Sequence, residues 1–172
     1  MLCLMEERQL KGSIRLAIRE DLPQLTALWE ELMGMHAGLH QAFALAPNAL
    51  RLARQSLGAR LRDPHTRIFT YDKEGKLHGM LIAHYESSQS FHRLQRRGYI
   101  AETIVRAPHR GTGIGKRLVN AACDWLYAMG ADYVELQVAP ANLSALDFWE
   151  GQGFGPLTLH MARLRPEKEP PA

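Results

Sequence analysis

The stretch APHRGTGIGKRL (residues 107–118) places an arginine and three glycines between a strand-like run and a helix-like run. Backbone N–H groups at the start of a helix lack partners inside the helix and lie at the positive end of its dipole, so they stabilise an anion. Gly111, Gly113 and Gly115 lack side chains, which lets a phosphate approach those N–H groups. Arg110 adds a charged donor. The stretch is therefore predicted to bind a pyrophosphate.

Two other phosphate-binding patterns do not fit this stretch. A nucleoside-triphosphate loop needs GxxxxGK followed by Ser or Thr, but Arg110 stands where its first glycine belongs and Arg117 follows the lysine. The dinucleotide fingerprint GxGxxG needs a third glycine, and Lys116 and Leu118 occupy the two positions where it would fall. The pattern that remains is Arg-x-x-Gly-x-Gly.

The rest of the chain alternates between strand and helix patterns, which indicates one α/β domain. Strands are predicted over residues 13–20, 66–72, 77–86, 98–107, 132–139 and 157–164. Helices are predicted from Asp21 to about Met35, from Pro47 through Leu61, from Ile114 to Gly130 and from Asn142 to Gly153.

Three local signals support these boundaries. Asp21 and Gln24 have the spacing of a helix capping box. Gly75 lies in a tight turn between the second and third strands, which predicts an antiparallel hairpin. Asn142 is a typical first residue for the last helix.

The composition is that of a globular domain. The 172 residues are 46% hydrophobic and 23% charged, and the net charge of +3 favours an anionic ligand without reaching the charge density of a nucleic-acid-coating protein. Cys3 and Cys123 form no CxxC pair, so neither a disulfide framework nor a zinc site is expected. No signal peptide or membrane span is apparent, and we expect a cytoplasmic protein. We assign residues 1–12 to an N-terminal extension, 13–165 to the domain and 166–172 to a disordered tail.

Residues 110–115, preceded by TIVRAPH, resemble the acyl-CoA signature of the GNAT superfamily of N-acetyltransferases. The segment VELQVAPANLSALDFWEGQGF (134–154) resembles the strand, the Asn-initiated helix and the closing Gly-Phe that follow in this family. The resemblance covers residues 14–164 and implies a mixed, mainly antiparallel twisted sheet flanked by helices. It also implies direct attack of an amine on the thioester of bound acetyl-CoA in a ternary complex, without a covalent enzyme intermediate.

The resemblance assigns roles to individual residues. The strand before the glycines splays from its neighbour in this family, so that the pantetheine arm pairs with the backbone of Thr103, Ile104 and Val105. The phosphates would meet Arg110 and the backbone amides of Gly111, Thr112, Gly113, Ile114, Gly115 and Lys116. Asn142 would meet the pantetheine or adenine side of the cofactor, serve as a plain helix cap, or do both.

Trp149 departs from the family pattern. Many members carry a tyrosine seven residues after the asparagine, where its hydroxyl protonates the departing CoA thiolate. An indole N–H can donate a hydrogen bond to the sulfur but supplies no acid proton. Three explanations stay open: the thiolate leaves unaided or takes a proton from water, Tyr133 or Tyr127 serves instead, or the protein binds acyl-CoA without much turnover.

Glu102 interrupts the apolar run of the strand before the glycines and is the predicted general base. The alternative is that Glu102 is an ordinary outward-facing strand residue. Some relatives carry a glutamate one residue earlier, where this chain has Ala101. Glu86 and His84 end the preceding strand and are further candidates, acting through water. No metal ligand set is apparent.

The acceptor of the acetyl group stays open among a small amine, an amino acid, a polyamine and a protein amine. The basic loop FHRLQRR (91–97) is interpreted as solvated, or as an acceptor contact that favours a carboxylate or phosphate. The predicted function is acetyl transfer from acetyl-CoA to a primary amine. The alternatives are a non-catalytic acyl-CoA-binding or sensor domain and transfer of a longer acyl group. We expect no membrane or nucleic-acid partner, and dimerisation is common in the family.

Overall fold

The computed structural model describes residues 12–87 and 91–165. Its sheet has the strand order β1-β2-β3-β4-β5, with β1 Ser13–Leu16, β2 Thr66–Lys73, β3 Lys76–Ser87, β4 Arg96–Val105 and β5 Tyr133–Leu136. The α-helices of the described ranges are α2 Leu22–Ala37, α3 Ala49–Arg60, α4 Ile114–Ala128 and α5 Leu143–Glu150. Short 3-10 turns occur at η1 Arg19–Asp21, η2 Gln41–Phe43 and η3 Ala107–His109.

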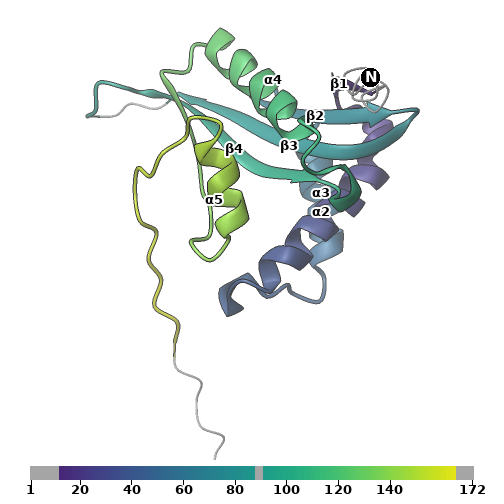
Figure 1. Ribbon diagram of the computed structural model, residues 1–172, viewed down its shortest axis with the longest axis horizontal. Coiled ribbons are helices and arrows are strands. Elements are labelled where there is room, and N and C mark those ends of the chain that lie inside the picture. The colour runs from purple at the N-terminus through teal and green to yellow at the C-terminus, as the bar shows by residue number, and fades with distance from the viewer. Residues whose placement is uncertain (1–11, 88–90, 166–172) are drawn as a thin grey trace, which may run out of the picture.

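Helices cover both faces of the sheet, with α2 and α3 on one side and α4 on the other (Figure 1). Because successive strand residues point to opposite faces, β3 contributes to two cores. Met80 and Ile82 pack with α2 and α3, whereas Leu81 and Ala83 pack with α4. The predicted α/β domain with a mixed sheet flanked by helices is confirmed.

The strands are antiparallel from β1 to β4, and β5 runs parallel to β4. Glu74 and Gly75 join β2 to β3 with φ angles of 55° and 78°. Two successive residues with positive φ are typical of the two-residue hairpin turn that matches the twist of its strands. The predicted hairpin is therefore confirmed.

Asp21 and Gln24 do not form the predicted capping box. The Asp21 carboxylate accepts hydrogen bonds from Arg15 of β1 at 2.6 and 2.9 Å and is not bonded to the backbone of α2. The Gln24 amide instead donates to the carbonyl of Gly75 and accepts from the N–H of Leu77. Both side chains therefore attach α2 to the sheet, an arrangement that local spacing does not reveal.

The strand predicted over residues 157–164 is wrong. Residues 155–165 form neither helix nor strand and run away from the body of the molecule beyond α5 (Figure 1). Their apolar side chains Leu157, Leu159 and Met161 are 70%, 74% and 82% exposed. The alternating pattern is present, but no neighbouring strand of the described chain pairs with it. Apart from Gly12, the predicted extension 1–12 and tail 166–172 lie outside the described residues.

Candidate active site

The glycine stretch connects β4 to α4, as predicted. Gly111 and Gly113 have φ angles of 75° and 81°, a conformation that side chains other than glycine rarely adopt, and Gly113 is the N-cap of α4. No atom lies within 4 Å of the position that a Cβ would take at either glycine. The space beside these two glycines is therefore free, which leaves room for a phosphate at the start of α4.

Gly115 has a different role from the other two glycines. It lies inside α4, and a Cβ there would stand 3.0 and 3.1 Å from two ring carbons of Phe148 on α5. This glycine allows α4 and α5 to approach each other closely. Gly115 thus contributes to the site by allowing the position of α5, and not by setting the conformation of the loop.

The base of the glycine stretch is held by a pair of histidine rings. His109 of η3 lies against His78 of β3, with ring centroids 4.1 Å apart. The carbonyl of His109 accepts a hydrogen bond from the Thr112 hydroxyl at 2.7 Å. Burial and the nearby positive charges lower the pKa of His78, so its ring is neutral at neutral pH. The strand predicted to end at 107 ends at Val105 because Pro108 lies within η3.

Arg110 points away from the glycines. Its Nε donates to the carbonyl of Val105 at 2.9 Å, and Nη2 lies 3.3 Å from the Met35 sulfur and 4.0 Å from Glu31 of α2. Arg110 thus braces the loop against β4 and α2 in this structure. Lys116 is exposed on the first turn of α4.

The sheet opens between β4 and β5. Register pairs run from Arg97 with Tyr133 to Ile100 with Leu136, and β4 continues beyond them for five residues, 101–105. An extra β4 residue, Ala101, forms a bulge against β3. The bulge lies at the point where β4 separates from β5. Bulges bend a strand and increase its twist, which accounts for the opening here.

The register shows which backbone groups face that opening. The N–H of Arg106 donates to the carbonyl of His78 on β3 at 2.9 Å. Hydrogen-bonding direction alternates along an antiparallel strand, so Ile104 also directs its backbone groups to β3. Thr103 and Val105 direct theirs to the open edge. Of the three predicted pantetheine contacts, these two have the required orientation, and the buried Ile104 side chain belongs to the core beneath α2.

Glu102 faces the side of the sheet covered by α2 and α3. Its side chain is 15% exposed, and Oε2 accepts a hydrogen bond from Arg60 Nη1 at 2.5 Å. Arg60 is the last residue of α3. The predicted base is therefore an ion-paired carboxylate held by a helix that is distant in sequence.

A polar network extends from Glu102 across the same face. Arg97 forms ion pairs with Glu86 and with Glu135 of β5, and its guanidinium lies 5.6 Å from the centre of the Tyr99 ring. Burial, together with the charges of Glu102 and other carboxylates, raises the pKa of Tyr99. His84 Nδ1 lies 2.8 Å from the Thr66 hydroxyl, and Nε2 lies 3.5 Å from Glu86.

Two arginines of the predicted basic loop are paired with carboxylates. Arg96 contacts Asp132 at 2.7 Å, and Arg97 is held by Glu86 and Glu135. Their charge is balanced within the protein. These two arginines therefore do not support the expectation that the loop favours a carboxylate or phosphate on the acceptor.

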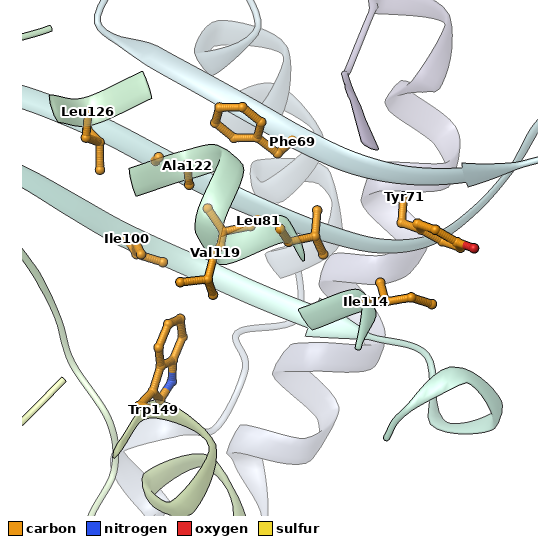
Figure 2. Packing of buried hydrophobic residues seen from close by; sticks show 11 residues of the cluster. Phe69, Tyr71, Leu81, Ile100, Ile114, Val119, Ala122, Leu126 and Trp149 are labelled. Carbon is orange, nitrogen blue, oxygen red and sulfur yellow. The ribbon is translucent and has the colours of Figure 1, made fainter. Parts of the chain in front are cut away.

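Asn142 and Trp149 both belong to α5. The Asn142 side chain accepts a hydrogen bond from the N–H of Ala145 at 3.2 Å, which confirms the cap. Trp149 is 8% exposed, and Figure 2 shows its ring directed into the apolar cluster with Val119 and Ile100. It makes edge-on contacts with Phe148 and Phe154, with ring centroids 5.0 and 5.2 Å away. The indole is thus placed as a core residue.

Comparison with known proteins agrees with this geometry. The profile of the Acetyltransferase (GNAT) family matches residues 25–154, three quarters of the chain. The chain belongs to the GNAT acetyltransferase family. β4 and α4, which flank the glycine stretch, both lie within the matched residues.

Individual relatives match over shorter stretches. The chain is 31% identical over 68 residues to YobR, an uncharacterized N-acetyltransferase of Bacillus subtilis, covering 40% of this chain and 28% of YobR. It is 41% identical over 58 residues to N-alpha-acetyltransferase 30 of Saccharomyces cerevisiae, covering 34% of this chain and 33% of that protein. The matches thus span about a third of these relatives. A crystal structure of a tetramutant of BH1408 from Bacillus halodurans has the same fold, with a TM-score of 0.80 at 20% identity, covering 89% of this chain and 99% of that one.

The described residues of this GNAT domain offer neither a metal site nor a membrane-spanning helix. Among the described residues, no group of three or more His, Cys, Asp or Glu side chains is arranged to hold a metal ion. No helix within residues 12–87 and 91–165 is both long and apolar enough to cross a membrane.

The roles of three residues near the site could not be predicted from the sequence. Arg60 belongs to a helix with several arginines, and nothing local distinguishes the one that reaches Glu102. Tyr99 and Phe148 lie in apolar runs that predict core positions. Tyr99 lies near Glu102 because of the register of β4. Phe148 lies near Gly115 because of the packing of α5.

Proposed function

We propose that this GNAT protein transfers the acetyl group of acetyl-CoA to a primary amine. The observation that carries the proposal is the continuity between the β4–β5 opening and the amides at the start of α4. The open backbone groups of Thr103 and Val105 pair with the pantetheine arm, and the amides of residues 111–116 bind the two phosphates. A backbone N–H on the open edge also polarises the thioester carbonyl as negative charge develops on its oxygen.

In the proposed reaction the amine nitrogen attacks the thioester carbon. A C–N bond forms, the C–S bond breaks, and the electron pair leaves with the CoA sulfur as a thiolate. Glu102 takes the proton that the amine must lose, either directly or through one water molecule. Its ion pair with Arg60 holds the carboxylate in place on β4. Because Trp149 is buried in the core, the thiolate leaves unaided or takes a proton from water.

The test measures release of the CoA thiol from acetyl-CoA in the presence of small amines, amino acids, polyamines and peptides with free α-amino groups. The peptides are included because a relative is an N-alpha-acetyltransferase. We expect thiol release that depends on one acceptor class, with acetylated acceptor identified by mass spectrometry. Tight binding of acetyl-CoA without release for any acceptor would favour the sensor alternative. Faster thiol release from a longer acyl-CoA would favour transfer of a longer acyl group.

Substitution of the proposed base gives a second prediction. Glu102→Gln should lower turnover by about 10²-fold or more, since positioned proton transfer contributes on that scale. The affinity for CoA should stay unchanged because the side chain faces away from the glycine stretch. Glu150→Gln, on the exposed end of α5, is the matched control. Equal turnover in the two variants would remove Glu102 from the mechanism.

A further inference from the structure

The Val105 carbonyl at the open edge of β4 already has a partner inside the protein. Ile104 and Arg106 direct their backbone groups to β3, so the Val105 carbonyl lies on the opposite side, where β4 has separated from β5. The Nε of Arg110 donates a hydrogen bond to this carbonyl at 2.9 Å. Arg110 therefore occupies one of the backbone groups that are proposed to pair with the pantetheine arm.

The other contacts of the Arg110 guanidinium are weak for a charged group. Nη2 lies 3.3 Å from the sulfur of Met35, and a thioether is a weak acceptor. The ion pair with Glu31 is 4.0 Å long, and the same carboxylate is closer to Arg106, at 3.2 Å. The Arg110 side chain is 48% exposed, and an exposed ion pair of this length contributes little to stability. The guanidinium can therefore leave α2 at little cost in free energy.

A stronger partner for Arg110 belongs at the start of α4. Gly111 follows Arg110 directly, and the space beside Gly111 and Gly113 is free for the diphosphate of CoA. A pair of arginine and phosphate joins two charged groups and is often bidentate, so it is stronger than the bond to a neutral carbonyl. Exposed side chains rotate rapidly. Arg110 can thus pass from the Val105 carbonyl to the diphosphate by rotation about its side-chain bonds.

We propose that Arg110 exchanges the Val105 carbonyl for the diphosphate of CoA and thereby couples the nucleotide half of CoA to its pantetheine half. When the diphosphate draws the guanidinium to the start of α4, the Val105 carbonyl becomes free to accept a hydrogen bond from an N–H of the arm. The bond between Arg110 and Val105 is broken once, whichever half binds first, so each half strengthens the binding of the other. This inference rests on the proposed function, because it concerns the same CoA site.

Two fragments of CoA separate the two halves in the test. ADP carries a diphosphate without the arm, and pantetheine carries the arm without a phosphate. Calorimetry measures the binding of ADP and CoA, and NMR titration measures the binding of pantetheine with and without saturating ADP. In the unsubstituted protein, ADP should raise the affinity for pantetheine about two- to fivefold, which is the scale of one hydrogen bond.

Arg110→Met should move the two affinities in opposite directions. Pantetheine should bind with the higher affinity even without ADP, because the Val105 carbonyl is already free. ADP should bind about fivefold or more weakly, because the charged contact to the diphosphate is lost. The coupling between the two fragments should disappear.

Lys116→Met is the matched control. Lys116 is exposed on the first turn of α4, and its replacement removes the same charge near the diphosphate while leaving the bond between Arg110 and Val105 in place. This variant should bind ADP more weakly, but ADP should still raise its affinity for pantetheine about two- to fivefold.

Three results would overturn the proposal. If ADP does not strengthen the binding of pantetheine to the unsubstituted protein, no exchange links the two halves. Weaker binding of pantetheine to Arg110→Met means that Arg110 supports the edge of β4 and does not block it. Unchanged ADP affinity in Arg110→Met means that the guanidinium does not reach the diphosphate. Failure of the unsubstituted protein to bind CoA is a distinct result, because it contradicts the proposed function and this inference with it.

Discussion

Single side chains in this protein take their roles from partners on other secondary-structure elements. The Glu102 carboxylate is held by Arg60, 42 residues earlier, and Asp21 is held by Arg15 across a turn. Sequence spacing predicted a base at Glu102 and a cap at Asp21. The role of Glu102 as a base stays a prediction, whereas Asp21 does not cap α2 because its carboxylate accepts hydrogen bonds from Arg15 of β1.

Replacing Asp21 tests the energetic importance of its pair with Arg15. The carboxylate is buried, and the Arg15 hydrogen bonds, followed by the Ile18 N–H, lower its pKa below the ordinary value of 3.8. Asp21→Asn should reduce the free energy of unfolding at neutral pH by about 1–2 kcal/mol, since Arg15 keeps its second partner Asp72.

The stability lost in Asp21→Asn should depend on pH in a defined direction. A carboxyl whose pKa is lowered in the folded state stabilises the fold fully above pH 3.8, and this contribution is lost as the pH falls from there through the folded-state value. The difference between the two proteins should therefore shrink in acid. Urea unfolding at neutral and acidic pH measures it, and a difference that stays constant would contradict the account.

Trp149 provides a second test at the residue scale. Because its ring packs between Phe148 and Phe154, Trp149→Phe should lower stability modestly and leave turnover within about twofold. Trp149→Ala should cost about 3–5 kcal/mol of stability through the cavity it leaves. Thermal unfolding and thiol release on the same samples separate the two effects. A large loss of turnover in a fully stable Trp149→Phe variant would show that the indole acts in catalysis.

At the scale of elements, the site depends on how α4, α5 and β4 meet. The loop glycines set the start of α4, Gly115 brings α5 close to it, and the Ala101 bulge separates β4 from β5. The glycines are visible in the sequence, but the bulge is not. A single extra residue in one strand is apparent only when the register of its partner is known.

Gly115 tests the contact between α4 and α5. Gly115→Ala should lower the free energy of unfolding by about 1–3 kcal/mol, because the new methyl group would stand about 3 Å from the Phe148 ring. Gly34→Ala in α2 is the matched control: it meets no atom within 4 Å and should gain up to about 1 kcal/mol in helix stability. Phe148→Leu combined with Gly115→Ala should recover part of the loss. A stabilising Gly115→Ala would contradict the predicted close contact.

At the scale of the whole molecule, the sequence was sufficient for the α/β fold, the hairpin, α4 with its preceding glycines and the Asn142 cap. These features are encoded locally by periodicity, turn residues and caps. The pairing of Arg60 with Glu102 and the orientation of the β4 edge depend on tertiary register. The error at residues 157–164 has another cause: alternation of apolar and polar residues does not by itself form a strand, which also needs a neighbouring strand to pair with.

The start of α4 is proposed to bind the pyrophosphate of acetyl-CoA, and calorimetry with CoA on Gly113→Val tests this proposal. Valine disfavours the φ of 81° and brings a side chain into the space above the amides. With two phosphate hydrogen bonds lost, affinity should fall about 100-fold or more relative to the unsubstituted protein and to Gly34→Ala. Thermal unfolding should confirm that the variant is folded. Unchanged CoA affinity in folded Gly113→Val would contradict the claim.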